Sequence, residues 1–295
     1  MNAAVTTTTN NQSVNVLAKP KNRAWERFKS NRLALISLFI MAALILLALL
    51  APLIAPYDPA DQELMNRLKP PSKEHWFGTD DLGRDLLSRV LYGARVSLSV
   101  GIFSVVFNVI IGVVVGSLAG YYGGRVDSIL MRLVDVLLAF PQFFVLITVV
   151  TILKPSLFNI IAVFVAFGWM GKARLLRGQF MSIKNREFVD AARTIGMSDF
   201  RIIFVHILPN AIAPVIISAT LQMGSMILTE SSLSFLGLGI QPPTASWGNL
   251  LQSAQSLTIM TKAPWYPVIP GCMIFLTIMC FNFIGDGLRS AFDSR

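Results

Sequence analysis

Residues 187–210 read EFVDAARTIGMSDFRIIFVHILPN, a charged two-helix pattern between strongly apolar segments. The first helix carries small and apolar residues at helical spacing, which gives it one such face: Phe188, Ala191, Ala192 and Ile195. Gly196 can adopt backbone conformations that other residues resist, so it can end this helix sharply. Ser198 and Asp199 supply the start of a second helix. The pattern predicts an amphipathic helical hairpin over residues 187–206, which either lies on a lipid surface or docks into a soluble partner.

The composition of the chain is that of an integral membrane protein. Of its 295 residues, 54% are hydrophobic and 14% are charged, and the mean hydropathy is +0.62. An ordinary soluble protein has about 25% charged residues. The net charge of +9 raises the question of nucleic-acid binding, but the basic residues are spread between apolar runs, where membrane topology explains them better. We therefore expect a lipid membrane as a partner and no nucleic acid.

Apolar segments on both sides of the hairpin predict an all-α polytopic membrane protein with six transmembrane helices. The predicted spans are residues 33–55, 96–119, 128–153, 157–171, 207–229 and 266–285. The fourth is short, and it spans only if its helix continues past Gly171, tilts or lies among other helices. In the second span, Gly112, Gly116 and Gly120 recur every four residues, which predicts close approach of another helix.

The polar segments predict how the chain is oriented and divided. Residues 1–18 are polar and predict a disordered tail. A basic run follows, so the unit of residues 19–94 has a cytoplasmic start, the first span and an extracytoplasmic loop. Residues 95–288 hold the remaining spans, and residues 289–295 form a cytoplasmic C-terminus. Residues 231–265 contain glycines and prolines that favour a bent or re-entrant segment over a span.

The outer loop and the spans hold charged residues whose roles stay open. An acidic and basic cluster at residues 80–89 is either an outer gate or docking surface for a delivery protein, or a salt-bridged helical cap over the membrane mouth, and the cap is favoured. Arg132 and Asp135 are three residues apart, so they can pair and face a wet cavity, or Arg132 can reach the interface. Glu230, near the outer end of the fifth span, either contacts substrate or reaches water. We assign Arg132, Asp135 and Glu230 as candidates for a translocation path.

Neither cysteines nor histidines predict a metal site. Cys272 and Cys280 lie in one apolar run, where packing is the expected role. His75 and His206 have no other ligand residues at metal-binding spacing.

The hairpin resembles the coupling motif of ABC-importer permeases, in which Glu-Ala-Ala is followed at fixed spacing by Gly and then Leu-Pro. The matching residues are Asp190-Ala191-Ala192, Gly196 and Leu208-Pro209, with Asp190 where Glu is usual. His206 stands where the general pattern has Ile, and the His-Ile-Leu-Pro-Asn form is similar to the dipeptide, oligopeptide and nickel branch. Further stretches are similar to the same branch: Phe77-Gly78-Thr79-Asp80, Gly83-Arg84-Asp85, residues 233–239, Trp247-Gly248, Phe281-Asn282 and residues 285–289.

The resemblance implies a type I ABC-importer permease fold with a cytoplasmic coupling helix, in a bacterial cytoplasmic (inner) membrane. It implies a transport subunit that is not an enzyme and binds no cofactor, because two partner ATPase subunits use the ATP and Mg. It also implies a second permease subunit, of a different chain, and an extracytoplasmic substrate-binding protein. The residues that it places in coupling to the ATPase are Glu187, Phe188, Asp190, Ala191, Ala192, Ile195, Gly196 and Pro209.

The substrate and two other classes of function remain open. The resembled branch carries di- and oligopeptides, nickel complexes and glutathione, and peptides are favoured because the chain has no cluster of metal ligands. A passive channel or facilitator would need no soluble partner. A membrane-embedded enzyme would need clustered histidines or acids at the depth of the active site, and the sequence shows none.

Overall fold

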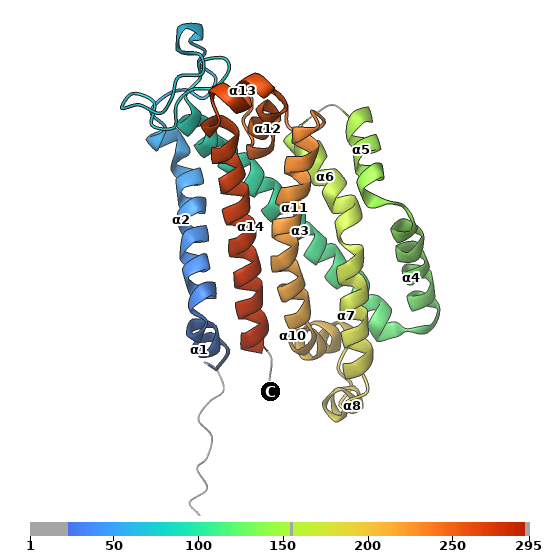
Figure 1. Cartoon of the computed structure of the whole chain (residues 1–295). Coiled ribbons are helices and arrows are strands. Elements are labelled where there is room, and N and C mark those ends of the chain that lie inside the picture. Colours follow the sequence, from blue (N-terminus) through green and yellow to red (C-terminus); the bar gives the residue numbers. More distant parts are fainter. Residues whose placement is uncertain (1–22, 154–155, 293–295) are drawn as a thin grey trace, which may run out of the picture.

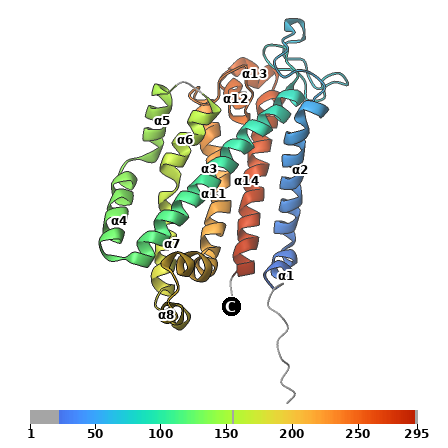
Figure 2. The ribbon, with the colours of Figure 1, turned by 180° about the vertical axis from the view of Figure 1, so that it is seen from behind.

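The computed structural model describes residues 23–153 and 156–292, in which all regular secondary structure is helical. The predicted disordered tail, residues 1–18, and the last three residues of the predicted C-terminal segment lie outside the described residues. Long helices stand side by side, with loops and short helices at one end and the hairpin at the other (Figure 1). The described C-terminal end and α1 lie at the same end as the hairpin α8 (Figures 1 and 2).

The N-terminal unit packs on the last helix of the chain. It consists of α1 (Arg23–Ser30), α2 (Arg32–Ile54) and a loop with one short 3-10 turn, η2 (Leu64–Asn66). The Asn31 side chain accepts a hydrogen bond of 3.1 Å from the Ala34 amide, which caps α2. Both α1 and α2 contact α14 (Trp265–Phe292).

The longest helix, α3 (Leu86–Tyr122, 37 residues), crosses the bundle obliquely (Figure 2). It begins ten residues before the predicted span 96–119, because the Asp85 side chain caps it by accepting a 2.8 Å hydrogen bond from the Ser88 amide. The predicted close approach at its glycines is confirmed. A Cβ atom added to Gly116 would lie 2.5 Å from the Ala173 carbonyl oxygen of α7.

The predicted third span, 128–153, is divided into α4 (Gly124–Ala139) and α5 (Gln142–Ile152), which are bent by 80°. The reason is Pro141, which lacks an amide hydrogen and disfavours helix in the residue before it.

The fourth span continues well past the expected end at residue 171, the first of the possibilities that the sequence left open. With Trp169 between them, α6 (Leu157–Gly168) and α7 (Met170–Ile183) form one helix of 27 residues.

The hairpin follows as α8 (Glu187–Thr194), α9 (Asp199–Arg201) and the π-helix η3 (Ile202–Ile207). The predicted fifth span, 207–229, begins too early. Its first residues belong to α10 (Leu208–Ala211), and the chain bends by 63° before α11 (Ala213–Phe235). Prolines lie in the first turns of both α10 and α11, where their missing amide hydrogens are tolerated.

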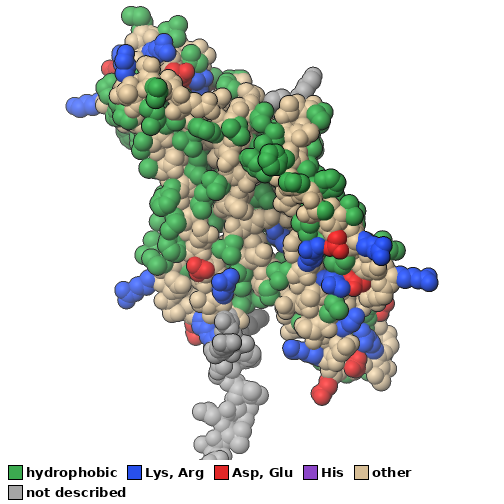
Figure 3. All heavy atoms as spheres, turned by 45° about the vertical axis from the view of Figure 1, so that its right-hand side comes forward, with side chains coloured by type: hydrophobic (Ala, Val, Ile, Leu, Met, Phe, Trp, Pro, Cys, Tyr) green, Lys and Arg blue, Asp and Glu red, His purple; other side chains and the backbone are tan. Residues whose placement is uncertain are grey.

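The segment predicted not to span, 231–265, begins too early, because α11 continues to Phe235, and residues 236–264 contain no spanning helix. They form α12 (Trp247–Leu251), η4 (Gln252–Gln255) and α13 (Leu257–Lys262). Within the described residues, four helices are long and apolar enough to cross a membrane, or six if each bent pair is one span. Charged side chains gather toward the two ends of the molecule, with a largely uncharged band between them (Figure 3).

Candidate functional site

The hairpin turns at Gly196, as the sequence predicts. Gly196 has a φ of +76°, a conformation that strains residues with a side chain. The amide of Gly196 donates to the Arg193 carbonyl at 2.9 Å, and the amide of Met197 donates to the Ala192 carbonyl at 3.1 Å. These bonds close the carboxyl end of α8 and direct the chain into α9.

One face of α8 is buried against the bundle. Val189 and Ala192 pack in an apolar cluster with Ile202 and Ile203 of η3 and with Phe180 of α7. The predicted small and apolar face is therefore divided, because Ala192 points inward and its predicted companions point outward. This packing fixes the hairpin to the spanning helix α7.

A polar contact joins the hairpin to α3. The Tyr121 hydroxyl, at the end of α3, donates a 2.7 Å hydrogen bond to the Asp199 carboxylate. The Arg193 guanidinium lies over the Tyr121 ring, 5.5 Å from its centroid. The hairpin is thus held by α3 and by α7, which is the second half of the 27-residue helix formed by α6 and α7.

The outward face of the hairpin combines apolar and acidic side chains. Phe188 is 40% exposed, and Ile195 and Phe200 are each 71% exposed. Glu187 and Asp190 are also exposed, and Asp190 pairs with Arg193 at 3.2 Å. Ala191, Gly196 and Pro209 complete the exposed members of the predicted coupling set. A rimmed apolar patch of this kind is typical of a protein interaction surface.

A second feature is a cavity of about 360 Å³ between α4 to α7 and α11, which we call the inner cavity. Its polar lining residues are Gln142, Lys172, Ser218, Gln222, Ser225 and Thr229. The Lys172 ammonium donates to the Gln222 side-chain oxygen, and the Gln222 amide nitrogen donates to the Gly168 carbonyl at 3.0 Å. The surface is hollowed near the middle of the face seen in Figure 3.

The sequence did not predict the inner cavity. Lys172 begins a run of basic residues, a pattern that is typical of a cytoplasmic surface and not of a cavity wall. The spacing of Ser218, Gln222, Ser225 and Thr229 by four, three and four residues puts them on one helical face. That spacing was the signal that could have revealed a polar face in the fifth span.

The three predicted path residues do not line the inner cavity. Arg132 and Asp135 are exposed and do not pair, because Asp135 pairs with Arg174 of α7 instead. Within the described residues, no ion pair is formed by Arg132.

Glu230 is fully buried, so it does not reach water in this conformation. Its carboxylate accepts hydrogen bonds from Ser234 at 2.7 Å and from Ser97 of α3 at 3.2 Å. The Ser97 hydroxyl in turn accepts a 3.1 Å bond from the Trp247 amide. Glu230 thereby links the short helix α12 to α3 and α11.

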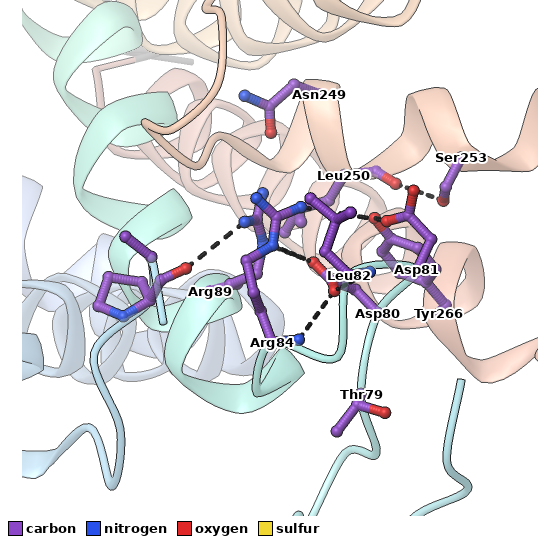
Figure 4. Close-up of polar contacts among 12 residues, drawn as sticks. Thr79, Asp80, Asp81, Leu82, Arg84, Arg89, Asn249, Leu250, Ser253 and Tyr266 are labelled. Atoms are coloured by element: carbon purple, nitrogen blue, oxygen red, sulfur yellow. Dashed lines mark hydrogen bonds and ion pairs between the residues drawn. The ribbon is translucent and has the colours of Figure 1, made fainter. Parts of the chain in front are cut away.

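The end opposite the hairpin is closed by residues 57–85 with α12 and α13, which we call the outer cap. Asp80 pairs with Arg84 at 2.6 Å and with Arg89 at 3.4 Å, and all three are buried (Figure 4). The Tyr266 hydroxyl of α14 donates to Asp81 at 3.3 Å, which joins the loop to the last helix (Figure 4). The ion pairs that the sequence favoured are therefore present, but residues 80–85 form a loop and not the expected helix, which begins at Leu86.

Comparisons with known proteins agree with this arrangement. Residues 112–295 match the family of binding-protein-dependent transport system inner membrane components, and residues 20–71 match the N-terminal transmembrane domain of oligopeptide transport permease C. The chain is 43% identical over 269 residues to the oligopeptide transport system permease protein OppC of Bacillus subtilis, covering 91% of this chain and 88% of that one. It is 44% identical over 276 residues to the dipeptide transport system permease protein DppC of Alkalihalophilus pseudofirmus, covering 94% and 90%. It is also 43% identical over 277 residues to the glutathione transport system permease protein GsiD of Escherichia coli, covering 94% and 91%. The chain therefore belongs to the binding-protein-dependent permeases of ABC importers, and to the branch that contains the C-type permeases of oligopeptide and dipeptide transport.

Proposed function

We propose that this chain lines the path of an ATP-driven importer for di- and oligopeptides and receives its driving force through the hairpin, residues 187–206. The observation that carries the proposal is the outward face of that hairpin. Its exposed apolar side chains, Phe188, Ile195 and Phe200, fit a cleft in a separate ATPase subunit. Its acids, Glu187 and Asp190, suit basic groups at the rim of such a cleft.

The attachment of the hairpin supports a mechanical role. Because Tyr121 bonds to Asp199 and α8 packs on α7, a force on the hairpin acts on α3 and α7 together. Two ATPase subunits that approach each other on ATP binding would pull two such hairpins together. The bundles would then rock between inward and outward access. ATP and Mg are bound by the partners in this scheme.

The proposal also orients the chain. The hairpin meets ATPases in the cytoplasm of a bacterium, so α1 and the C-terminal end, which lie at the same end, are cytoplasmic too (Figure 1). The outer cap then faces an extracytoplasmic binding protein. A second permease chain covers the opposite wall of the path.

Peptides are the proposed cargo because similar permeases are named for peptide transport. OppC and DppC are named for oligopeptides and dipeptides, and GsiD is named for glutathione, itself a small peptide-like acid. Glutathione and nickel complexes are the alternative cargo of the same machine. Uptake of labelled peptides, glutathione and nickel is compared between the parent strain and a strain that lacks this chain. The cargo is the compound whose uptake is lost.

The coupling role is tested with Gly196→Val. No atom lies within 4 Å of the added Cβ, so the strain comes from the left-handed backbone and is about 1–2 kcal/mol. We expect transport-linked ATP hydrolysis by the assembled complex to fall about ten-fold while membrane insertion is retained. Gly178→Val is the matched control, because Gly178 also has free space but lies within α7. Undiminished coupled transport in Gly196→Val would contradict the proposal.

A passive channel is separated from the proposed importer by two measurements. An importer co-purifies with an ATPase from gently solubilised membranes and accumulates peptide in vesicles only with ATP. A channel does neither, and it equilibrates solute without ATP.

A further inference from the structure

The inner cavity contains a buried positive charge. Lys172 is only 3% exposed, although it is a lysine in the middle of a 27-residue spanning helix. An ionisable side chain at such a depth is costly unless it serves a path or a ligand. Lys172 is therefore the residue of the inner cavity for which we look for a ligand.

The protein gives Lys172 only a neutral partner. Its ammonium donates to the Gln222 side chain, and no carboxylate of the described residues lies within 4.0 Å of it. The nearby acids are paired elsewhere, since Asp135 bonds Arg174 and Asp127 bonds Arg177. An ammonium has three hydrogens to donate, so donors remain for a ligand.

Gln222 is held in the orientation that this contact requires. Its amide nitrogen donates to the Gly168 carbonyl at 3.0 Å, which leaves the side-chain oxygen facing Lys172. A Cβ on Gly168 would lie 2.2 Å from the Asn108 side chain, so the backbone here is closely packed by α3. Lys172 is thus held at the wall of the inner cavity by Gln222, which is itself held by the closely packed backbone at Gly168.

The other walls of the inner cavity provide neutral polar groups. Ser218, Ser225 and Thr229 share one face of α11 with Gln222, and Gln142 comes from the start of α5. The opposite side of α11 packs on α3 and α14. A volume of about 360 Å³ lies within the roughly 300–1,000 Å³ of small-ligand sites.

We propose that Lys172, oriented by Gln222, binds the carboxylate of a peptide in transit through the inner cavity. The hydroxyls and amides of α11 and α5 would meet the peptide's backbone groups. This assignment rests on the proposed function. It means that substrates are selected twice, first by the extracytoplasmic binding protein (the delivery protein) and then by Lys172 inside the membrane. A charge-assisted hydrogen bond is strong enough to discriminate an acid from its neutral amide.

The test uses the complete transporter, with its ATPase and delivery protein, in proteoliposomes. Two labelled peptides are compared, a tripeptide with a free terminal carboxylate and the same tripeptide as its terminal amide. Each is supplied at a concentration that saturates the delivery protein, so that uptake reports the membrane step. We expect the wild type to prefer the free acid by about ten-fold or more.

Three variants test the residue. Lys172→Gln should abolish the preference, whereas Lys172→Arg, which keeps the charge, should retain most of it. Gln222→Glu should also abolish it, because it supplies an internal carboxylate to Lys172 with almost no change in shape. Lys184→Gln, at the residue that follows the end of α7 and outside the cavity, is the matched control and should keep the wild-type preference.

The outcomes separate this inference from the proposed function. If the wild type transports peptide but shows no preference, or if either Lys172→Gln or Gln222→Glu assembles and keeps the preference, the carboxylate site is overturned and the permease function stands. If the wild type accumulates no peptide with ATP, the proposed function fails. Gln222→Glu keeps the test decisive even where Lys172→Gln does not assemble.

Discussion

The outer cap and the hairpin use their charged and apolar side chains in opposite ways. In the cap, Asp80 is buried and pairs with two buried arginines, Arg84 and Arg89, the second of which lies in α3. In the hairpin, Ile195 and Phe200 are turned outward. Buried charges that pair within the chain need no other molecule, whereas an exposed apolar patch is typical of a surface that another molecule covers. The cap is therefore completed within this fold, whereas the hairpin leaves an apolar surface exposed, which we propose is one half of an interface.

The largest expected effect is in the cap. Asp80→Asn removes the carboxylate that pairs with both buried guanidinium groups, those of Arg84 and Arg89, and leaves them the more distant Asp81, 4.0 Å from Arg84. Breaking a buried pair in this way costs about 3–5 kcal/mol. We expect a clear decrease in the free energy of unfolding of the purified chain, measured by thermal or denaturant unfolding in detergent.

Asp81→Asn is the control for that experiment. Asp81 lies 4.0 Å from Arg84 and its side chain is partly exposed, so its loss should cost about 1 kcal/mol or less. Equal destabilisation by the two variants would mean that the buried cluster does not stabilise the cap.

A smaller effect is expected where the hairpin joins α3. Tyr121→Phe removes the hydrogen bond to the Asp199 carboxylate and should destabilise the hairpin by about 1.5–3 kcal/mol. Hydrogen exchange of the amides in residues 187–206 measures this local opening. Tyr122→Phe is the matched control, because no hydrogen bond of the Tyr122 hydroxyl is seen in the described part of the chain. Unchanged exchange in Tyr121→Phe would show that the hairpin is not held through α3.

The smallest effect on folding is expected at the outward face. Ile195→Ser should change the stability of the chain by less than about 0.5 kcal/mol, because Ile195 is exposed. It should nevertheless weaken ATPase binding by ten-fold or more, measured by titration of the purified subunits. Ile203→Ser is the inverse case. Ile203 is buried in the same hairpin, so this change should destabilise the fold by several kcal/mol. An Ile195→Ser protein that binds the ATPase normally would refute the docking face.

The features that were predicted from the sequence are those set by local chemistry. Apolar runs gave the spanning helices, the spacing of Gly112, Gly116 and Gly120 gave the contact of α3 with α7, and Gly196 gave the turn of the hairpin. Each of these depends on residues that are close together in the chain.

The features that were missed depend on contacts between distant segments. The burial of Lys172 follows from its packing beside α3 and α11, and nothing local distinguishes it from the basic residues that follow, Arg174, Arg177 and Lys184. Asp135 pairs with Arg174 across two helices instead of with Arg132 on its own helix. The bend before α11 was also missed, although Pro209 and Pro214 mark the helix starts on both sides of it.

The length of α3 has a consequence for how the two ends communicate. At 1.5 Å per residue its 37 residues extend about 55 Å, well beyond the roughly 30 Å of a hydrocarbon layer. A single straight rod therefore reaches from the cap, where Asp85 begins it, to the hairpin, where Tyr121 holds Asp199. A seesaw motion of about 10° around its midpoint would displace each tip by about 5 Å, in opposite directions. Opening on one side of the bilayer and closing on the other would then be the same movement.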